Sequence, residues 1–175
     1  RPYFFTILRD EPYKNMERIF EAYSRLGWRS RPDLVAVIPC YKRRVDIKGV
    51  RIIRRTLTQK ELARWYCGAV AYLTPSLIET FCMPITEAMG CGCPVLTSNT
   101  TACAEVAGHA AYLVDPCSIE EISLGMERLA GDAALRRELR LKGLARSKQF
   151  TWRKSAAALL RVFMEVMPGG RDGRP

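Results

Sequence analysis

Long apolar runs, histidine and signs of disulfide pairing are scarce or missing in this sequence of 175 residues. No apolar run reaches the length of about eighteen residues that crosses a bilayer as a helix, and residues 1–8 lack the three sections of a signal peptide. The seven cysteines are an odd number in a chain long enough to fold without disulfides. We therefore expect a soluble, unexported protein in a reducing, cytoplasmic setting.

Several motifs that carry chemistry are also absent. The sequence has no Walker A run, no G-x-G-x-x-G and no Asp-x-Asp pair. Its single histidine, His109, belongs to no recognisable Ser/His/Asp set, and the one-residue spacing of Cys91 and Cys93 does not suit zinc. The sequence therefore predicts neither a metal site nor a cofactor.

The net charge of +10 is concentrated in two segments. Residues 42–64 carry nine basic and two acidic side chains and residues 136–154 carry eight and one, whereas residues 68–135 carry eight carboxylates and one arginine. Such segments are typical of solvated helix surfaces, of contacts with anionic membranes or substrates, or of nucleic-acid binding. Nucleic acid is the least favoured partner, because residues 42–64 contain no interleaved aromatics on which bases stack.

Strand-like and helix-like segments alternate along most of the chain. Short apolar runs predict strands at residues 3–8, 34–38, 50–53, 70–73, 95–97 and 111–114. Helices are predicted between them, two of which start at capping boxes, Thr58/Glu61 and Ser118/Glu121. After residue 132 only helices follow, to about residue 148 and over residues 152–166.

This order predicts an α/β fold, a Rossmann-like parallel sheet flanked by helices, with further helices at the C-terminus. Residues 1–167 form one domain, and residues 168–175, rich in glycine and arginine, are predicted to be a disordered tail.

Residues 75–90 are the richest candidate site, because they follow a predicted strand and open a helix. Pro84 suits the first position of a helix, so the backbone amides of residues 81–83 are expected at the sheet edge, where a phosphate binds well. Glu87 is placed to accept hydrogen bonds from ribose hydroxyls, and Glu79 is expected at the rim. The alternative roles are a carboxylate that favours the helix start and a solvated loop charge.

Several motifs, in order, resemble those of a known family. Glu79 and Glu87 enclose seven residues and resemble the E-x7-E signature of retaining glycosyltransferases of family 4, which have the GT-B fold. Residues 88–95 resemble the family's EAMA-G-PV run, residues 105–111 its EV-G-AA segment, and residues 150–152 its F-S/T-W ending. Arg9 and Lys14 resemble its R-x4-K pair.

The resemblance implies a role for each matching residue. Arg9 and Lys14 grip the donor diphosphate and stabilise the leaving group, Glu87 binds the ribose and Glu79 contacts the sugar. The phosphates meet the amides of Phe81, Cys82 and Met83, and the base lies beside residues 55–57, which end at Leu57. The chain departs from the family pattern at Thr80 and Cys82, where glycines are usual and the sugar approaches closely.

The implied function is that of a hexosyl-type glycosyltransferase in surface polysaccharide or glycolipid synthesis. By this resemblance, the chain corresponds to the C-terminal, donor-binding half of a GT-B enzyme. It binds a nucleoside diphosphate sugar as substrate, without a metal or cofactor, and needs an N-terminal acceptor-binding domain in the same or another polypeptide, without which it is expected to be inactive. An anionic membrane surface, at the inner face, is a second expected partner. The alternative function is a catalytically silent nucleotide-binding or interaction module of the same fold, which the two missing glycines favour.

Overall fold

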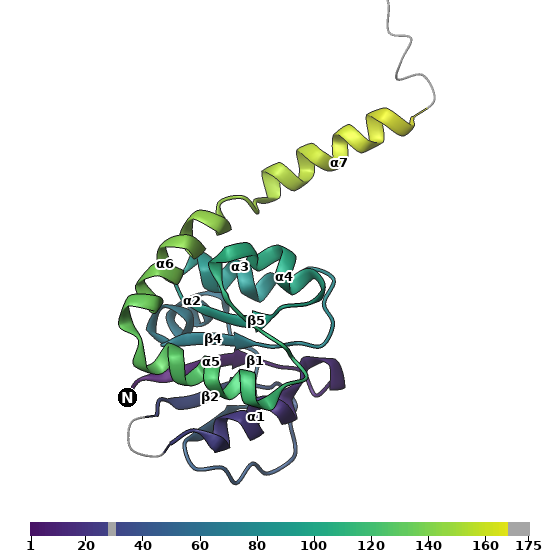
Figure 1. Cartoon of the computed structure of the whole chain (residues 1–175). Helices are drawn as coiled ribbons and strands as arrows, with labels where there is room; N and C mark the ends of the chain where they lie inside the picture. Colours follow the sequence, from purple (N-terminus) through teal and green to yellow (C-terminus); the bar gives the residue numbers. More distant parts are fainter. Residues whose placement is uncertain (28–30, 168–175) are drawn as a thin grey trace, which may run out of the picture.

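The structure, a computed structural model, describes residues 1–27 and 31–167. Its centre is a six-stranded sheet in the order β3-β2-β1-β4-β5-β6, in which every neighbouring pair is parallel (Figure 1). The strands are β1 (Tyr3–Ile7), β2 (Asp33–Val37), β3 (Val50–Ile53), β4 (Ala71–Thr74), β5 (Val95–Ser98) and β6 (Tyr112–Val114). All six predicted strands are therefore present, and the predicted α/β class is confirmed.

Helices cover both faces of this sheet. The helices of the chain are α1 (Met16–Arg25), α2 (Gln59–Gly68), α3 (Met83–Gly90), α4 (Thr101–Ala107), α5 (Ile119–Gly131), α6 (Ala133–Ser147) and α7 (Trp152–Val166), with short 3-10 turns η1 (Pro12–Lys14) and η2 (Gly108–Ala110). His109 lies in η2. Helices α1 to α5 turn their apolar faces to the sheet, as amphipathic spacing predicts, and α6 packs on α3 and α5.

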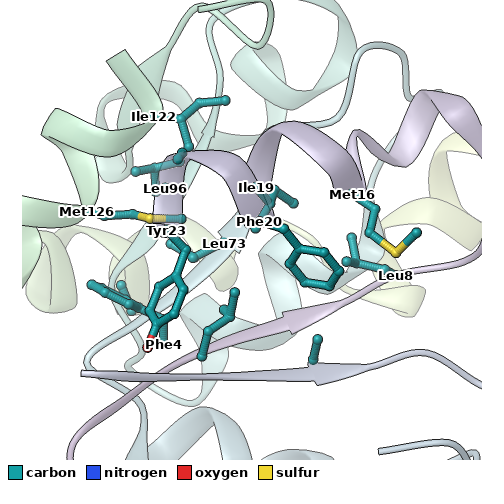
Figure 2. Close-up of a cluster of buried hydrophobic side chains, with 14 of the residues drawn as sticks. Phe4, Leu8, Met16, Ile19, Phe20, Tyr23, Leu73, Leu96, Ile122 and Met126 are labelled. Carbon is teal, nitrogen blue, oxygen red and sulfur yellow. The ribbon is translucent and has the colours of Figure 1, made fainter. Parts of the chain in front are cut away.

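Two buried clusters hold the layers together, one on each face of the sheet. On the first face, Ile19 of α1 and Met126 of α5 pack over Phe4 and Leu73 of the strands (Figure 2). On the second face, side chains of α2, α3 and α4 pack on β1, β4 and β5, and the rings of Tyr66 and Tyr72 meet edge to face with centroids 5.3 Å apart. Burial on both faces explains why the strands read as continuous apolar runs.

The order of the strands reverses at β1. From β1 the chain goes outward to β2 and β3, and then returns to place β4 on the other side of β1. In open parallel sheets, ligands bind at the carboxyl ends of the strands beside such a reversal. The loops that follow β1 and β4 are therefore where a ligand site is expected.

The helix starts test the two predicted capping boxes. At α2 both hydrogen bonds of the box are present between Thr58 and Glu61, as predicted. At α5 the prediction is half wrong, because Ser118 accepts from the amide of Glu121 but the Glu121 carboxylate accepts from the amide of Asp115, 2.7 Å away. The loop after β6 thus supplies a competing donor that the local pattern does not reveal.

Helix α7 projects away from the sheet (Figure 1), and none of its residues is buried. Thr151 caps its start by accepting a hydrogen bond from the amide of Lys154. In the described part of the chain, no helix is both long and apolar enough to span a bilayer. The tail predicted at residues 168–175 lies outside the described residues.

Candidate functional site

The loops that follow β1 and β4 meet at the reversal of strand order. The amide of Leu77 donates to the carbonyl of Tyr13 over 2.8 Å, and the side chain of Asn15 donates to the carbonyl of Pro75 over 2.8 Å. These two bonds join the segment that carries Arg9 and Lys14 to the segment that carries Glu79. The structure therefore places both predicted groups at one edge of the sheet.

Lys14 and Glu79 form an ion pair within this edge. Lys14 Nζ lies 2.6 Å from Glu79 Oε1, and the side chains are only 16% and 11% exposed. Glu79 is predicted to lie at the rim of the site. Its side chain is more enclosed than that prediction implies, because Lys14 and the β1–α1 loop cover it. The pair sets a cation and a hydrogen-bond acceptor side by side, which suits a ligand that has both phosphate and hydroxyl groups.

Arg9 differs from Lys14 in its surroundings. Its residue is exposed, and within the described residues its side chain makes no hydrogen bond or ion pair. The structure therefore brings Lys14 and Glu79 together but leaves Arg9 without a contact to either. The long, exposed side chain of Arg9, two residues after β1, can still reach an anion at the same edge.

The start of α3 presents amides to the same edge. The backbone N–H groups of Phe81 and Cys82 donate to no acceptor in the described part of the chain, and Pro84 is the second residue of α3, one position later than predicted. A helix start of this kind attracts anions through unpaired N–H groups and the helix dipole. Phe81 and Met83 are themselves exposed, at 39% and 47%.

Cys82 stands where the family pattern has a glycine, and its backbone is in the left-handed region that glycine favours. Its φ is 65° and its ψ 66°, in the left-handed region, which costs a residue with a Cβ about 1–2 kcal/mol. Its side chain is buried beside Thr74, and a hydrogen bond to Cys103 together with burial raises the pKa of the Cys82 thiol. The uncharged side chain thus points into the core, while Thr80 lies exposed in the loop above.

Glu87 is held by a partner that the sequence did not single out. The hydroxyl of Tyr66, from α2, donates to Glu87 Oε2 over 3.2 Å. Burial, with the nearby charge of Glu87, raises the pKa of Tyr66 far above its usual value, so the phenol remains a donor. In the sequence, nothing distinguishes Tyr66 from an ordinary core residue, because it occupies the apolar face of its helix.

A cavity of about 990 Å³ opens beside Glu87. Its lining includes Gln59, Phe81, Met83, Phe150 and Trp152. The rings of Phe81 and Phe150 meet edge to face at 5.5 Å. Leu57, expected beside a base, is buried in the second core cluster and does not line this cavity, whereas Gln59, two residues later, does.

No group of three or more histidine, cysteine, aspartate or glutamate side chains in the described residues is arranged to hold a metal ion. The seven cysteines are free thiols, of which Cys82, Cys93 and Cys103 are buried. The predicted charged residues of the site are Arg9, Lys14, Glu79 and Glu87.

A parallel sheet in this strand order, with helices on both of its faces, defines the Rossmann-like α/β class. Residues 1–146 match the family model described as Glycosyl transferases group 1, and the chain belongs to that family. The resemblance to one half of a GT-B glycosyltransferase is thereby confirmed.

Individual proteins agree with this assignment. The O-antigen chain mannosyltransferase B of Escherichia coli is 29% identical over 164 residues, which are 87% of this chain and 43% of that protein. The sucrose-phosphate synthase of Thermosynechococcus elongatus superposes with a TM-score of 0.81 at 21% identity, over 94% of this chain and 45% of that one.

A structure from E. coli described as trehalose-6-phosphate bound with UDP-2-fluoro glucose superposes with a TM-score of 0.83 at 11% identity, over 95% and 45% of the two chains. The chain spans less than half the length of each of these three proteins.

Proposed function

We propose that this chain is the donor-binding half of a retaining, hexosyl-type glycosyltransferase whose donor is a nucleoside diphosphate sugar. The observation that carries the proposal is the convergence of Lys14, Glu79 and the start of α3 at the reversal of strand order. The E. coli structure described as bound with UDP-2-fluoro glucose, which shares this fold, supports a donor of this class.

The proposed chemistry is the transfer of a glycosyl group to an acceptor hydroxyl. As the bond between the anomeric carbon and the diphosphate oxygen breaks, negative charge gathers on the diphosphate, where Lys14, Arg9 and the amides of residues 81–83 stabilise it. Glu87 accepts hydrogen bonds from the ribose, and Glu79 contacts the sugar. Fixed cations and amides supply this stabilisation without a divalent metal.

The acceptor is proposed to bind a second domain that this chain does not include. The relatives are more than twice as long as the matched segment, and α7 offers a surface for the missing part. Trp152, Leu159 and Phe163 are 81%, 55% and 52% exposed on this helix, and an apolar helix face of this size is normally covered. We propose that the N-terminal domain, in the same or another polypeptide, covers it.

The biological setting is proposed from the relatives and from the charge. The E. coli relative is an O-antigen chain mannosyltransferase, which supports a role in surface polysaccharide or glycolipid synthesis. Such acceptors are carried at membranes, and the two basic segments suit the anionic inner face of one. The proposed place of action is therefore the cytoplasm, with peripheral contact to that face.

A catalytically silent module is the second candidate, and one observation favours it. Thr80 and Cys82 replace the glycines of the family pattern, and the exposed Thr80 adds bulk where the sugar approaches. A silent module keeps nucleotide binding or partner binding and lacks transfer.

Calorimetry with UDP, GDP and ADP tests the proposal on the chain itself. We expect binding of one of them at micromolar to millimolar dissociation constants, about −8 to −4 kcal/mol, unchanged by EDTA, and weakened by Lys14→Met. A matched variant, Lys142→Met, removes an exposed lysine from α6 and is expected to leave affinity unaltered. The donor-site assignment is rejected if no diphosphate binds at millimolar concentration, and the metal-free mechanism is rejected by a loss of tenfold or more with EDTA.

A further inference from the structure

Asn15, the residue after Lys14, uses its whole side-chain amide in a buried position. It is 3% exposed, and its Nδ2 donates to the carbonyl of Pro75 over 2.8 Å and to that of Pro116 over 2.7 Å. Its Oδ1 accepts from Arg18 Nη1 over 3.0 Å. Two carbonyls on one side and an arginine on the other define the orientation of the amide.

These bonds connect three loops at the carboxyl edge of the sheet. Asn15 follows β1, Pro75 directly follows β4, and Pro116 lies two residues beyond β6. Strand β6 pairs with neither β1 nor β4, because β5 lies between β4 and β6 in the sheet. One side chain therefore links parts of the edge that the backbone hydrogen bonds of the sheet do not join directly.

The backbone of Asn15 also sets the direction of the chain. Its φ of 60° and ψ of 31° lie in the left-handed region, which asparagine adopts more readily than most residues with a Cβ. The turn η1 ends there and α1 begins at the next residue. On the other side of Lys14, Tyr13 accepts from the amide of Leu77. Lys14 is therefore fixed through both of its neighbours to the loop that carries Glu79.

We propose that Asn15 is a positioning residue for the donor diphosphate, which acts by holding Lys14 against the β4–α3 loop. This role rests on the proposed function, since it assigns Lys14 to the phosphates. Asn15 touches no substrate itself. Its effect is limited to interactions that Lys14 makes, and the ribose contact of Glu87, on another element, is independent of it.

Two variants separate the side chain of Asn15 from its backbone conformation. Asn15→Gly keeps the left-handed conformation and removes all three hydrogen bonds, and Asn15→Asp keeps the shape but sets a carboxylate against two carbonyl oxygens. Calorimetry measures the binding of both variants to UDP, GDP and ADP, and to the matching monophosphates UMP, GMP and AMP. We expect the diphosphate that binds the parent chain to bind about tenfold more weakly, a difference of about 1.4 kcal/mol, because Lys14 is no longer held in place. Monophosphate affinity is expected to change less than twofold.

Controls distinguish positioning from general destabilisation. Tyr23→Phe removes one buried hydrogen bond, from the Tyr23 hydroxyl to the carbonyl of Pro32, far along α1 from the site, and is expected to lower the melting temperature without weakening diphosphate binding. In a Lys14→Met background, Asn15→Gly is expected to cause no further loss of affinity, because the two residues act through the same contact.

Each outcome decides the proposal. The proposal is overturned if Asn15→Gly binds the diphosphate as tightly as the parent chain does. It is also overturned if affinity for monophosphates and diphosphates falls equally, or if the losses of affinity caused by Asn15→Gly and Lys14→Met are fully additive. If the parent chain binds no diphosphate, the proposed function fails, and hydrogen exchange then tests the link between the loops. Asn15→Gly is expected to accelerate exchange of the Leu77 amide, which donates to Tyr13, at least tenfold while Tyr23→Phe does not, and unchanged exchange there refutes the link.

Discussion

Lys14 and Glu79 form an ion pair of 2.6 Å in which both side chains are largely shielded from water. One is the cation proposed to hold the diphosphate, and the other is the carboxylate proposed to touch the sugar. A diphosphate bound as proposed competes with Glu79 for the same ammonium, so we expect its binding to weaken the ion pair. The proposed binding and reacting groups are therefore coupled before any substrate arrives.

The first prediction concerns Glu79→Gln, which removes this competition. We expect the free energy of unfolding to fall by about 1 to 3 kcal/mol, since Lys14 loses a charged hydrogen bond. Nucleoside diphosphate affinity is expected to be unchanged or several-fold higher, and transfer by an enzyme that contains both domains is expected to fall. Calorimetry and the melting temperature with and without nucleotide measure the first two effects.

The matched control for Glu79→Gln is Glu138→Gln. Glu138 pairs with Lys142 at an exposed position of α6, and such pairs contribute at most about 1 kcal/mol. We expect neither stability nor nucleotide affinity to change measurably. A clear loss of diphosphate affinity in Glu79→Gln contradicts the competition between Glu79 and the diphosphate.

The second prediction concerns the apolar face of α7. At high protein concentration we expect the isolated chain to self-associate through this face, because Leu159 and Phe163 are more than half exposed. Replacing both by glutamate is expected to yield a monomer in sedimentation experiments, with an unchanged melting temperature. Lys154→Glu with Arg161→Glu, two substitutions on the polar side of the same helix, is the control. A parent chain that remains monomeric at all concentrations contradicts the prediction.

How far the sequence predicts the molecule depends on how local each signal is. The strands and most helices follow from apolar spacing, and the start of α3 follows from Pro84, because such features need only a few neighbouring residues. The E-x7-E segment lies within one loop and one helix, so it too could be located. Boundaries of several strands differ by one residue, as for β1, which is predicted over residues 3–8 and found at Tyr3–Ile7.

The contacts that complete the site could not be predicted in this way. Asn15 meets Pro75 and Pro116 across separations of 60 and 101 residues, and Tyr66 meets Glu87 across 21. Such contacts depend on strand order and on the relative rotation of helices, neither of which a local pattern encodes. Glu121 shows the same limit, since its carboxylate binds the amide of Asp115 rather than completing a box.

The third prediction concerns the two basic segments. We expect the chain to float with vesicles that contain anionic phosphatidylserine at low salt and to dissociate as salt rises, because exposed charges are screened over about 10 Å at 0.1 M salt. Lys42→Glu with Arg44→Glu, both exposed, is expected to weaken this binding by tenfold or more.

A control of equal charge addresses whether that binding is specific to the segment. Arg25→Glu with Arg128→Glu alters the net charge equally, at exposed positions outside both basic segments, and is expected to have a smaller effect. Equal losses in the two double variants indicate a response to net charge alone. No flotation of the parent chain at low salt means that these residues are solvated surface only.

The last prediction tests Tyr66 as the support of Glu87. Tyr66→Phe deletes one hydroxyl, and with it the hydrogen bond of 3.2 Å to the Glu87 carboxylate. Losing such a bond is expected to weaken nucleoside diphosphate binding by about 0.5 to 1.5 kcal/mol, and Glu87→Ala by about 1 to 3 kcal/mol, since the ribose then loses its charged acceptor. Because burial holds the pKa of Tyr66 far above neutral pH, the ratio of parent to Tyr66→Phe affinity is expected to be constant from about pH 6 to pH 9.

Tyr72→Phe is the matched control, because the Tyr72 hydroxyl is buried on the same cluster and has no hydrogen-bond partner in the described residues. Removing an unpaired buried hydroxyl is expected to leave nucleotide affinity unaltered and stability equal or higher. If Tyr66 acts through Glu87, Tyr66→Phe has no further effect on affinity in a Glu87→Ala background. Independent, additive losses, or equal losses in the two tyrosine variants, mean that Tyr66 contributes to the core alone and that Glu87 reaches the ribose without it.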